Sequence, residues 1–280
     1  MMKIKTLVAC LDNNIAPKNL QENYDNCGLI VGNPEETLTG ILTTLDVNYK
    51  VVDEAIQKNC NLIIAHHPII FFGLKTMVDS IHNQNIIMHA IKNGISIYAA
   101  HTSLDNVFEN SINQSIAKKI GLKNIEPLRE IATPEYCSNT TGSGAIGVLE
   151  NPEFIIEFIY GLKKKLGING AIRFSDIVTN YKINKIAICT GAGFFMAKEA
   201  IKKGAELFIT SDLTYHNFFD EKNIILADIG HYESEKHSSE VIYSLVKNFL
   251  TKHSEILKSE TIKEKIFISE VDTNPVAYAF

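Results

Sequence analysis

Several features that define common protein classes are missing from this sequence. Its 280 residues include no apolar run near the roughly 20 residues that are needed to cross a bilayer. The first apolar stretch holds about five residues, whereas a secretory signal needs roughly 7–15. We therefore expect a cytoplasmic protein with no membrane partner.

Paired or clustered cysteines are also missing. The five cysteines are widely scattered and form no C-x-x-C motif, so neither a zinc ribbon nor a disulfide framework is indicated. We expect free thiols at all five positions, which are Cys10, Cys27, Cys60, Cys137 and Cys189.

An excess of positive charge is the third missing feature. Lys and Arg number 27 against 32 Asp and Glu, which gives a net charge of −5. Proteins that bind nucleic acid are usually clearly basic, so nucleic acid is not an expected partner. The hydrophobic share of 45% is ordinary for a globular protein and suffices for a sizeable core.

Short apolar segments, such as 61–67, 95–101 and 205–212, alternate with helical patterns along the chain. Such alternation predicts an α/β fold with mostly parallel sheets. Because the two halves share this pattern, we predict two related α/β lobes, 1–127 and 128–280, that together form one compact unit.

The segment 151–167 has the spacing of a helix, and Asn151 and Pro152 suit the first positions of that helix. We therefore predict that the helix begins at Asn151. The segment from 128 to 150 is less regular and indicates turns around short strands.

Histidines stand at the ends of three strand-like segments. His66 and His67 end one apolar run, His101 ends the next, and His231 ends a third. In parallel α/β sheets, ligands and catalytic groups gather beyond the carboxyl ends of the strands. We therefore predict a metal site at the C-terminal ends of the strands, between the two lobes.

Carboxylates accompany these histidines. Glu235 lies four residues after His231, so both side chains leave one face of a helix that begins there. Asp105 follows His101 in the motif HTSLD. Three imidazoles and two carboxylates are more than one catalytic tetrahedral site uses, and they suit two divalent cations such as Zn²⁺, Mn²⁺ or Fe²⁺. The expected metal ligands are His66, His67, Asp105, His231 and Glu235.

Each motif also has a purely structural interpretation. The adjacent pair His66 and His67 could be a hydrogen-bonded surface pair. Asp105 could be the N-cap of the following helix. GHYESE could be a plain helix N-terminus whose acidic residues suit the helix dipole.

Two further motifs leave alternatives open. CTGAGF at 189–194 begins like a dinucleotide-binding turn but has Met196 at the third glycine position. A tight strand-to-helix turn is favoured there, although its amides could hold a phosphate. Asp212 and His216 could face the metal site, or they could be a loop cap and a surface residue.

Taken together, the motifs resemble a known family. The matching segments are ENYDNCGLIVGNPE (22–35), HHPIIF (66–71), HTSLDN (101–106), SDLTYH (211–216) and GHYESE (230–235). They resemble the GTP cyclohydrolase 1 type 2 homologue family, also described as dinuclear-metal-centre hexameric proteins. The resemblance implies that the five residues named above hold two divalent metals. It also implies that His101 handles protons beside them and that the chain forms a homohexamer.

The family name implies a reaction. Hydrolysis would open the imidazole ring of the guanine in GTP and release C8 as formate. Two alternatives stay open: a hydrolase of another small substrate, and a non-enzymatic metal-binding scaffold or metal-delivery and interaction protein. Candidate partners for a triphosphate are Arg173, Lys182 and Lys185.

Overall fold

The computed structural model describes the chain from residue 1 to 279, apart from residues 79–80, 133–139, 176–180, 221–222 and 258–259. It divides into two compact units. The first unit comprises Met1–Leu104 and His237–Thr273, and the second comprises Asp105–Lys236 and Asn274–Phe280. These boundaries differ from the predicted lobes, because a late part of the chain returns to complete the first unit.

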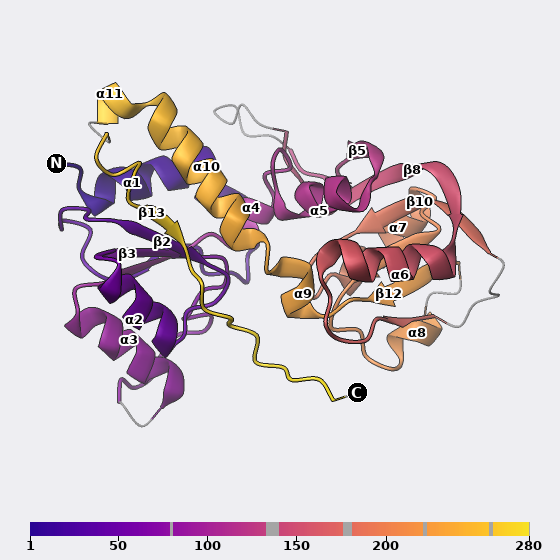
Figure 1. Cartoon of the computed structure of the whole chain (residues 1–280), viewed down its shortest axis with the longest axis horizontal. Helices are drawn as coiled ribbons and strands as arrows, with labels where there is room; N and C mark the ends of the chain where they lie inside the picture. The colour runs from indigo at the N-terminus through magenta and orange to yellow at the C-terminus, as the bar shows by residue number, and fades with distance from the viewer. Residues whose placement is uncertain (79–80, 133–139, 176–180, 221–222, 258–259, 280) are drawn as a thin grey trace. The chain divides into compact units, whose positions relative to one another are not determined.

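The first unit is built on a five-stranded sheet in the order β1-β4-β3-β2-β13 (Figure 1). Strands β4, β3, β2 and β13 are parallel, and β1 is antiparallel at one edge. The strands are β1 (Gly28–Val31), β2 (Ile41–Thr44), β3 (Leu62–Ala65), β4 (Ser96–Ala99) and β13 (Ile266–Ile268). The helices are α1 (Ile4–Cys10), α2 (Tyr49–Gln57), α3 (His82–Lys92), α10 (Ser238–Lys252) and α11 (Ser254–Leu257).

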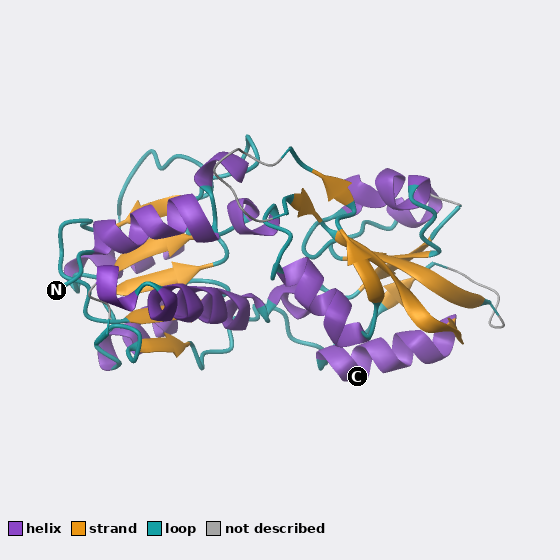
Figure 2. Cartoon of the chain, turned by 90° about the horizontal axis from the view of Figure 1, so that it is seen from above, coloured by secondary structure: helices purple, strands orange, loops and turns teal. Residues whose placement is uncertain are grey.

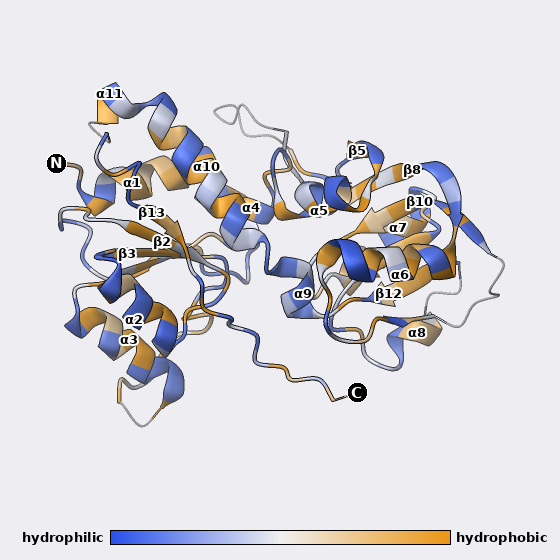
Figure 3. Ribbon diagram, in the orientation of Figure 1, coloured by the Kyte–Doolittle hydropathy of each residue, from blue (hydrophilic) through white to orange (hydrophobic). Residues whose placement is uncertain are grey.

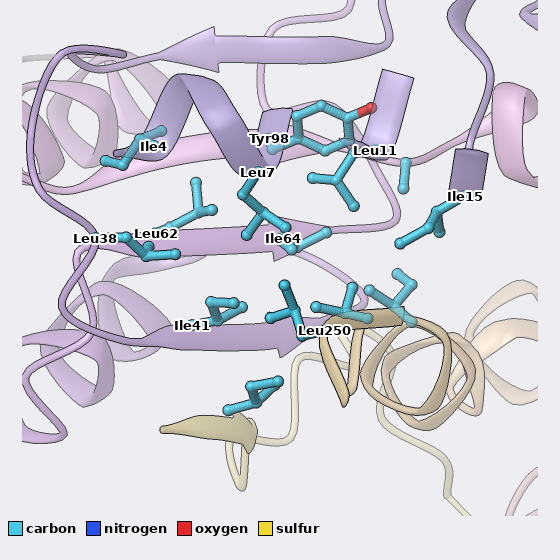
Figure 4. Close-up of a cluster of buried hydrophobic side chains, with 14 of the residues drawn as sticks. Ile4, Leu7, Leu11, Ile15, Leu38, Ile41, Leu62, Ile64, Tyr98 and Leu250 are labelled. Atoms are coloured by element: carbon cyan, nitrogen blue, oxygen red, sulfur yellow. The ribbon is translucent and has the colours of Figure 1, made fainter. Parts of the chain in front are cut away.

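Helices cover both faces of this sheet (Figure 2). Successive side chains of a strand point to opposite faces. Accordingly, Leu62 and Ile64 of β3 join a cluster with α1 and α10, whereas Ile63 joins a cluster with α2 and α3. Figure 4 shows Leu7 and Leu250 gathered with Ile64 in the first cluster. Burial on both faces explains why β3 has an unbroken apolar sequence.

The second unit has a six-stranded sheet in the order β5-β8-β10-β11-β12-β9. Its central strands β10, β11 and β12 are parallel, and the outer strands pair antiparallel. The strands are β5 (Lys123–Glu126), β8 (Ala145–Phe154), β9 (Arg173–Phe174), β10 (Lys182–Ile188), β11 (Leu207–Thr210) and β12 (Ile225–Asp228), with a separate pair β6 (Arg129–Glu130) and β7 (Gly142–Ser143). The helices are α5 (Ile112–Ile120), α6 (Ile155–Leu166), α7 (Ala197–Lys202), α8 (Asn217–Asp220) and α9 (His231–Glu235), and the chain enters this unit through α4 (Thr102–Asp105). The predicted α/β class with mostly parallel sheets is confirmed.

Amphipathic helices pack against this second sheet. In α6, Phe158 and Leu162 are buried while Lys164 is exposed, and Figure 3 shows the corresponding apolar and polar bands. The helix begins at Ile155 rather than at Asn151, so the predicted start was wrong. Strand β8 runs on through Phe154 because Glu153 and Phe154 pair with β10.

The cysteines that the structure describes are free, as predicted, namely Cys10, Cys27, Cys60 and Cys189. Cys137 lies outside the described residues. Among the helices of the described residues, none has the length and apolar character that a membrane crossing requires.

Candidate functional site

Three imidazoles meet in the first unit. His66 and His67 directly follow β3, and His101 follows β4, which lies parallel and next to β3. Parallel neighbours end at the same edge of a sheet, so the three side chains come together. One ring nitrogen of each lies within 4.8 Å of the others. His66 is fully buried, which argues against the interpretation as a surface pair.

The Nδ1 atoms of the first two imidazoles are held by acceptors. Nδ1 of His66 lies 2.9 Å from the carbonyl oxygen of Ala100. Nδ1 of His67 lies 2.7 Å from Oδ1 of Asp46, which follows the adjacent strand β2. An acceptor at Nδ1 keeps the proton there, so Nε2 becomes the nitrogen that can bind a metal.

Asp25 holds the third imidazole. Its fully buried carboxylate accepts hydrogen bonds from Nδ1 of His101 at 2.9 Å and from the backbone amide of Thr102 at 3.0 Å. The Thr102 hydroxyl donates to it as well. Burial alone would raise the pKa of Asp25, but the hydrogen bond and charge of His101, with Thr102, hold it well below its usual range. The sequence interpretation gave Asp25 no role, although it lies in the motif NYDN.

In the second unit, His231 and Glu235 leave the same face of α9, as the spacing of four residues indicates. Nε2 of His231 lies 2.9 Å from Oε2 of Glu235. Two ligands of a tetrahedral zinc ion lie roughly 3.3 Å apart when each bond is about 2.0–2.1 Å, so one cation fits both atoms with little movement. Glu235 is almost fully buried, with 5% of its side chain exposed.

Asp212 orients His231. Its Oδ2 lies 2.6 Å from Nδ1 of His231. Asp212 has a φ of 57°, a left-handed conformation that aspartate tolerates better than most residues. Of the two interpretations of Asp212, the structure favours the one in which it faces the candidate metal ligands, because it contacts His231. His216 is exposed and lies against Tyr215, with ring centroids 5.5 Å apart.

Asp105 also belongs to the second unit. Burial raises the pKa of the Cys189 thiol to about 12, and the charges of Asp105 and Glu235 add to this rise. Both carboxylates therefore lie near the same thiol. The N-cap of α5 is Ser111, whose side chain accepts from the amide of Gln114, so Asp105 does not cap that helix.

The CTGAGF segment is a structural turn. Its amides at Thr190, Gly191 and Gly193 donate to side chains of the protein, at distances of 2.9–3.0 Å. A phosphate-binding role would need these amides, so the alternative of a tight turn is supported. Gly191 has a φ of 64°, and a Cβ there would meet Oε1 of Glu235 at 2.4 Å. The turn thus leaves room for the Glu235 carboxylate.

The residues fit a divalent metal by their chemistry. Imidazole and carboxylate ligands suit borderline ions such as Zn²⁺, Mn²⁺ and Fe²⁺. Oriented imidazoles with an acceptor behind them are the usual environment of metal-binding histidines. His66, His67 and His101 therefore could bind a metal, and His231 with Glu235 offers a second set of ligands.

Comparison with known proteins gives the family. The model of Duf34/NIF3 (NGG1p interacting factor 3) matches residues 2–275. The chain belongs to the Duf34/NIF3 family. A GTP cyclohydrolase 1 type 2 homolog of Clostridium acetobutylicum is 32% identical to it over 280 residues, which cover 99% of each protein. The resemblance stated from the motifs is confirmed.

Solved structures of the Duf34/NIF3 fold agree. The crystal structure of a Staphylococcus aureus hypothetical protein matches with a TM-score of 0.86 and 30% identity, over 99% of both chains. A Bacillus cereus protein related to NIF3 matches with a TM-score of 0.85 and 23% identity over 99% of both chains, which shows the shared fold.

Proposed function

We propose that this Duf34/NIF3 protein binds two divalent metal ions through His66, His67, Asp105, His231 and Glu235. We also propose that it is a cytoplasmic metal-dependent hydrolase, with GTP as the first substrate to test. The observation that carries the proposal is the cluster of three imidazoles, each with its Nδ1 held by an acceptor. Bound ions would supply a Lewis acid that activates water for attack on an electrophilic carbon, which in GTP is C8.

His101 is the proposed catalytic residue. The buried Asp25 carboxylate fixes the ring and keeps the proton on Nδ1. Nε2 of His101 is then the atom that takes a proton from water and returns it to the leaving group. An imidazole can both accept and donate a proton, which the two steps require.

Two aromatic side chains near His101, the partly buried Phe71 and the exposed Tyr24, support a flat aromatic substrate. The ring of Phe71 lies 6.2 Å from that of His101, and Tyr24 lies 6.4 Å from Phe71. The side-chain amide of Asn26 donates to the carbonyl of Ile70 at 2.6 Å, which fixes the backbone directly before Phe71. A purine can stack on such rings.

The second unit has a similar feature. Tyr215 and Phe219 are 71% and 58% exposed, and their ring centroids are 5.1 Å apart. They follow Asp212, which orients His231. By contrast, Arg173 donates to Asp228 and to the carbonyl of Leu213, so this candidate for a triphosphate is already engaged. Lys182 and Lys185 then remain as the candidates for binding the phosphates.

Metal content and turnover test the proposal together. Purified chain is stripped with a chelator, reloaded with Zn²⁺, Mn²⁺ or Fe²⁺, and assayed for metal content and for formate release from GTP. We expect about two metals per chain and one formate per GTP consumed. Asp105→Asn should lose metal and turnover together. The control Asp53→Asn should keep both, because its carboxylate contacts His89 and none of the candidate ligands. An Asp105→Asn chain with full metal and full turnover would refute the ligand set.

Intact GTP with two bound metals would remove the cyclohydrolase activity from the proposal. It would favour a hydrolase of another substrate or a non-enzymatic scaffold or metal-delivery protein. Light scattering tests the proposed homohexamer, for which six chains of 31.2 kDa give about 187 kDa.

The proposed stacking of the base on Phe71 has its own test. Base stacking on one aromatic side chain contributes about 1–3 kcal/mol, so Phe71→Leu should raise the KM for GTP about 5- to 150-fold with metal content unchanged. The control is Phe195→Leu, which removes an aromatic ring of the second unit that is 59% exposed. Equal KM values for the two variants would exclude Phe71 from substrate recognition.

A further inference from the structure

The C-terminal segment beyond β13 forms no helix or strand among the described residues, yet its side chains reach the groups that support the ligands. In the first unit, the hydroxyl of Thr273 donates to Oδ2 of Asp46 at 3.1 Å. The other carboxylate oxygen of Asp46 lies 2.7 Å from Nδ1 of His67. Thr273 therefore restrains the carboxylate that orients a proposed ligand.

In the second unit, the same segment holds helix α9. The hydroxyl of Tyr278 donates to Oε1 of Glu233 at 2.8 Å, and the amide of Asn274 lies 3.5 Å from the same oxygen. Glu233 is 3% exposed and lies between His231 and Glu235 on α9. A buried carboxylate is costly without donors, so these contacts fix the orientation of the helix.

Two glycines leave the space that the Tyr278 ring and the Glu233 carboxylate occupy. A Cβ on Gly170 would meet the ring of Tyr278 at 2.4 Å. A Cβ on Gly230, which has a φ of 87°, would meet Oε2 of Glu233 at 2.3 Å. Both close approaches require glycine, and they indicate a fitted site for the tyrosine ring and for the carboxylate.

The donor at Tyr278 keeps its proton. Burial raises the pKa of Tyr278 to about 12, and the hydrogen bond and charge of Glu233 contribute to the rise. The hydroxyl is therefore protonated near neutral pH and can donate to Glu233.

We propose that residues 273–278 act as a positioning strap for the metal ligands, with Thr273 acting through Asp46 on His67 and Tyr278 acting through Glu233 on α9. Each of these contacts lies within one unit. The inference rests on the proposed metal-binding function, and it adds that the strap slows metal loss. Thr273 and Tyr278 are positioning residues that touch neither metal nor substrate.

Zn²⁺ release from the full-length chain tests the strap. The loaded protein is mixed with a chromophoric chelator, and the rate of Zn²⁺ transfer is followed. Substitution of residues behind metal ligands typically weakens binding about 10- to 100-fold, so we expect at least a tenfold faster release from Tyr278→Phe and Thr273→Val. Thr273→Ser keeps the hydroxyl and should release Zn²⁺ at the wild-type rate. Tyr160→Phe is the control, since its hydroxyl is on a side chain that is 73% exposed on α6.

Hydrogen exchange of the metal-free chain gives a second readout. In Tyr278→Phe, the amides of α9 should exchange faster than in wild type, while the amides of α6 should not change. Wild-type release rates together with unchanged α9 exchange would overturn the strap. If the wild-type chain binds no Zn²⁺, the proposed function fails, and the exchange of α9 alone still decides whether Tyr278 holds the helix.

Discussion

Gly191 offers a sharp test of whether Glu235 is a metal ligand. A Cβ at Gly191 would lie 2.4 Å from Oε1 of Glu235, whereas ordinary contacts begin near 3.4 Å. In Gly191→Ala the carboxylate must therefore move by about 1 Å. Carboxylate–zinc bonds are only about 2.0–2.2 Å long, so a displacement of this size breaks the bond or distorts it severely.

The substitution also strains the backbone, and that effect has to be separated from the displacement of the Glu235 carboxylate. Gly191 has a φ of 64°, and an alanine in the left-handed region costs about 1–2 kcal/mol. Gly204 supplies the control, because it has a φ of 74° in the same unit and nothing lies within 4 Å of its virtual Cβ. Gly204→Ala should therefore cost the same backbone strain without touching Glu235.

Two measurements compare the variants. Urea unfolding of the metal-free proteins should show a loss of about 1–2 kcal/mol for Gly204→Ala and at least as much for Gly191→Ala. Competition titration with Zn²⁺ should show affinity lowered about 10- to 100-fold or more for Gly191→Ala alone. Equal Zn²⁺ affinities for the two variants would refute the reasoning, because Glu235 would then tolerate the shift.

Three further predictions concern buried groups in the structure. Iodoacetamide at pH 8 should alkylate the half-buried Cys10 well before Cys189, since burial raises the pKa of Cys189 to about 12, and equal labelling by mass spectrometry would contradict this. Asp25→Asn should be less stable than wild type above about pH 4, where an unfolded aspartate is ionised. Because the folded pKa of Asp25 is depressed, the difference in urea unfolding should shrink as the pH falls below that value, and a constant difference would exclude its charge as the cause. Tyr98→Phe should lower the free energy of unfolding by about 1.5–3 kcal/mol, because the buried hydroxyl donates to Asp12 at 2.8 Å, and a value near zero would show that this bond contributes nothing.

The sequence predicted the presence of strands better than it predicted the residues at which helices and strands begin and end. Apolar runs such as 61–67 identify buried strands, because a parallel strand that is covered on both faces is apolar throughout. The start of α6 could not be read in the same way. Asn151 and Pro152 are suitable first residues for a helix, but pairing of residues up to Phe154 with β10 extends the strand instead. That pairing joins segments about 30 residues apart, and no local pattern reports it.

The candidate ligands could be predicted because they follow strands, and strand ends are visible in the sequence. The residues that orient them could not. Asp46 and Asp25 contact His67 and His101, which are 21 and 76 residues away in the chain. Such contacts depend on the order of the strands in the sheet, which the pattern of apolar residues does not specify. Gly191 could not be placed either, since its role follows from the position of a carboxylate on another element.

The orienting groups bear on the choice between a metal centre and structural histidines. A buried histidine that only fills space needs one acceptor, and a backbone carbonyl would serve, as Ala100 does for His66. At His67, His101 and His231 the acceptor is instead a carboxylate, at 2.6–2.9 Å. A carboxylate at Nδ1 makes the imidazole more basic at Nε2 and therefore a better metal ligand or proton acceptor. The three carboxylates come from different parts of the chain, and one of them is supplied from the left-handed region of the backbone. This repeated arrangement, at three histidines that follow strands, is expected where Nε2 must bind or move a cation, and it favours a metal centre over structural histidines.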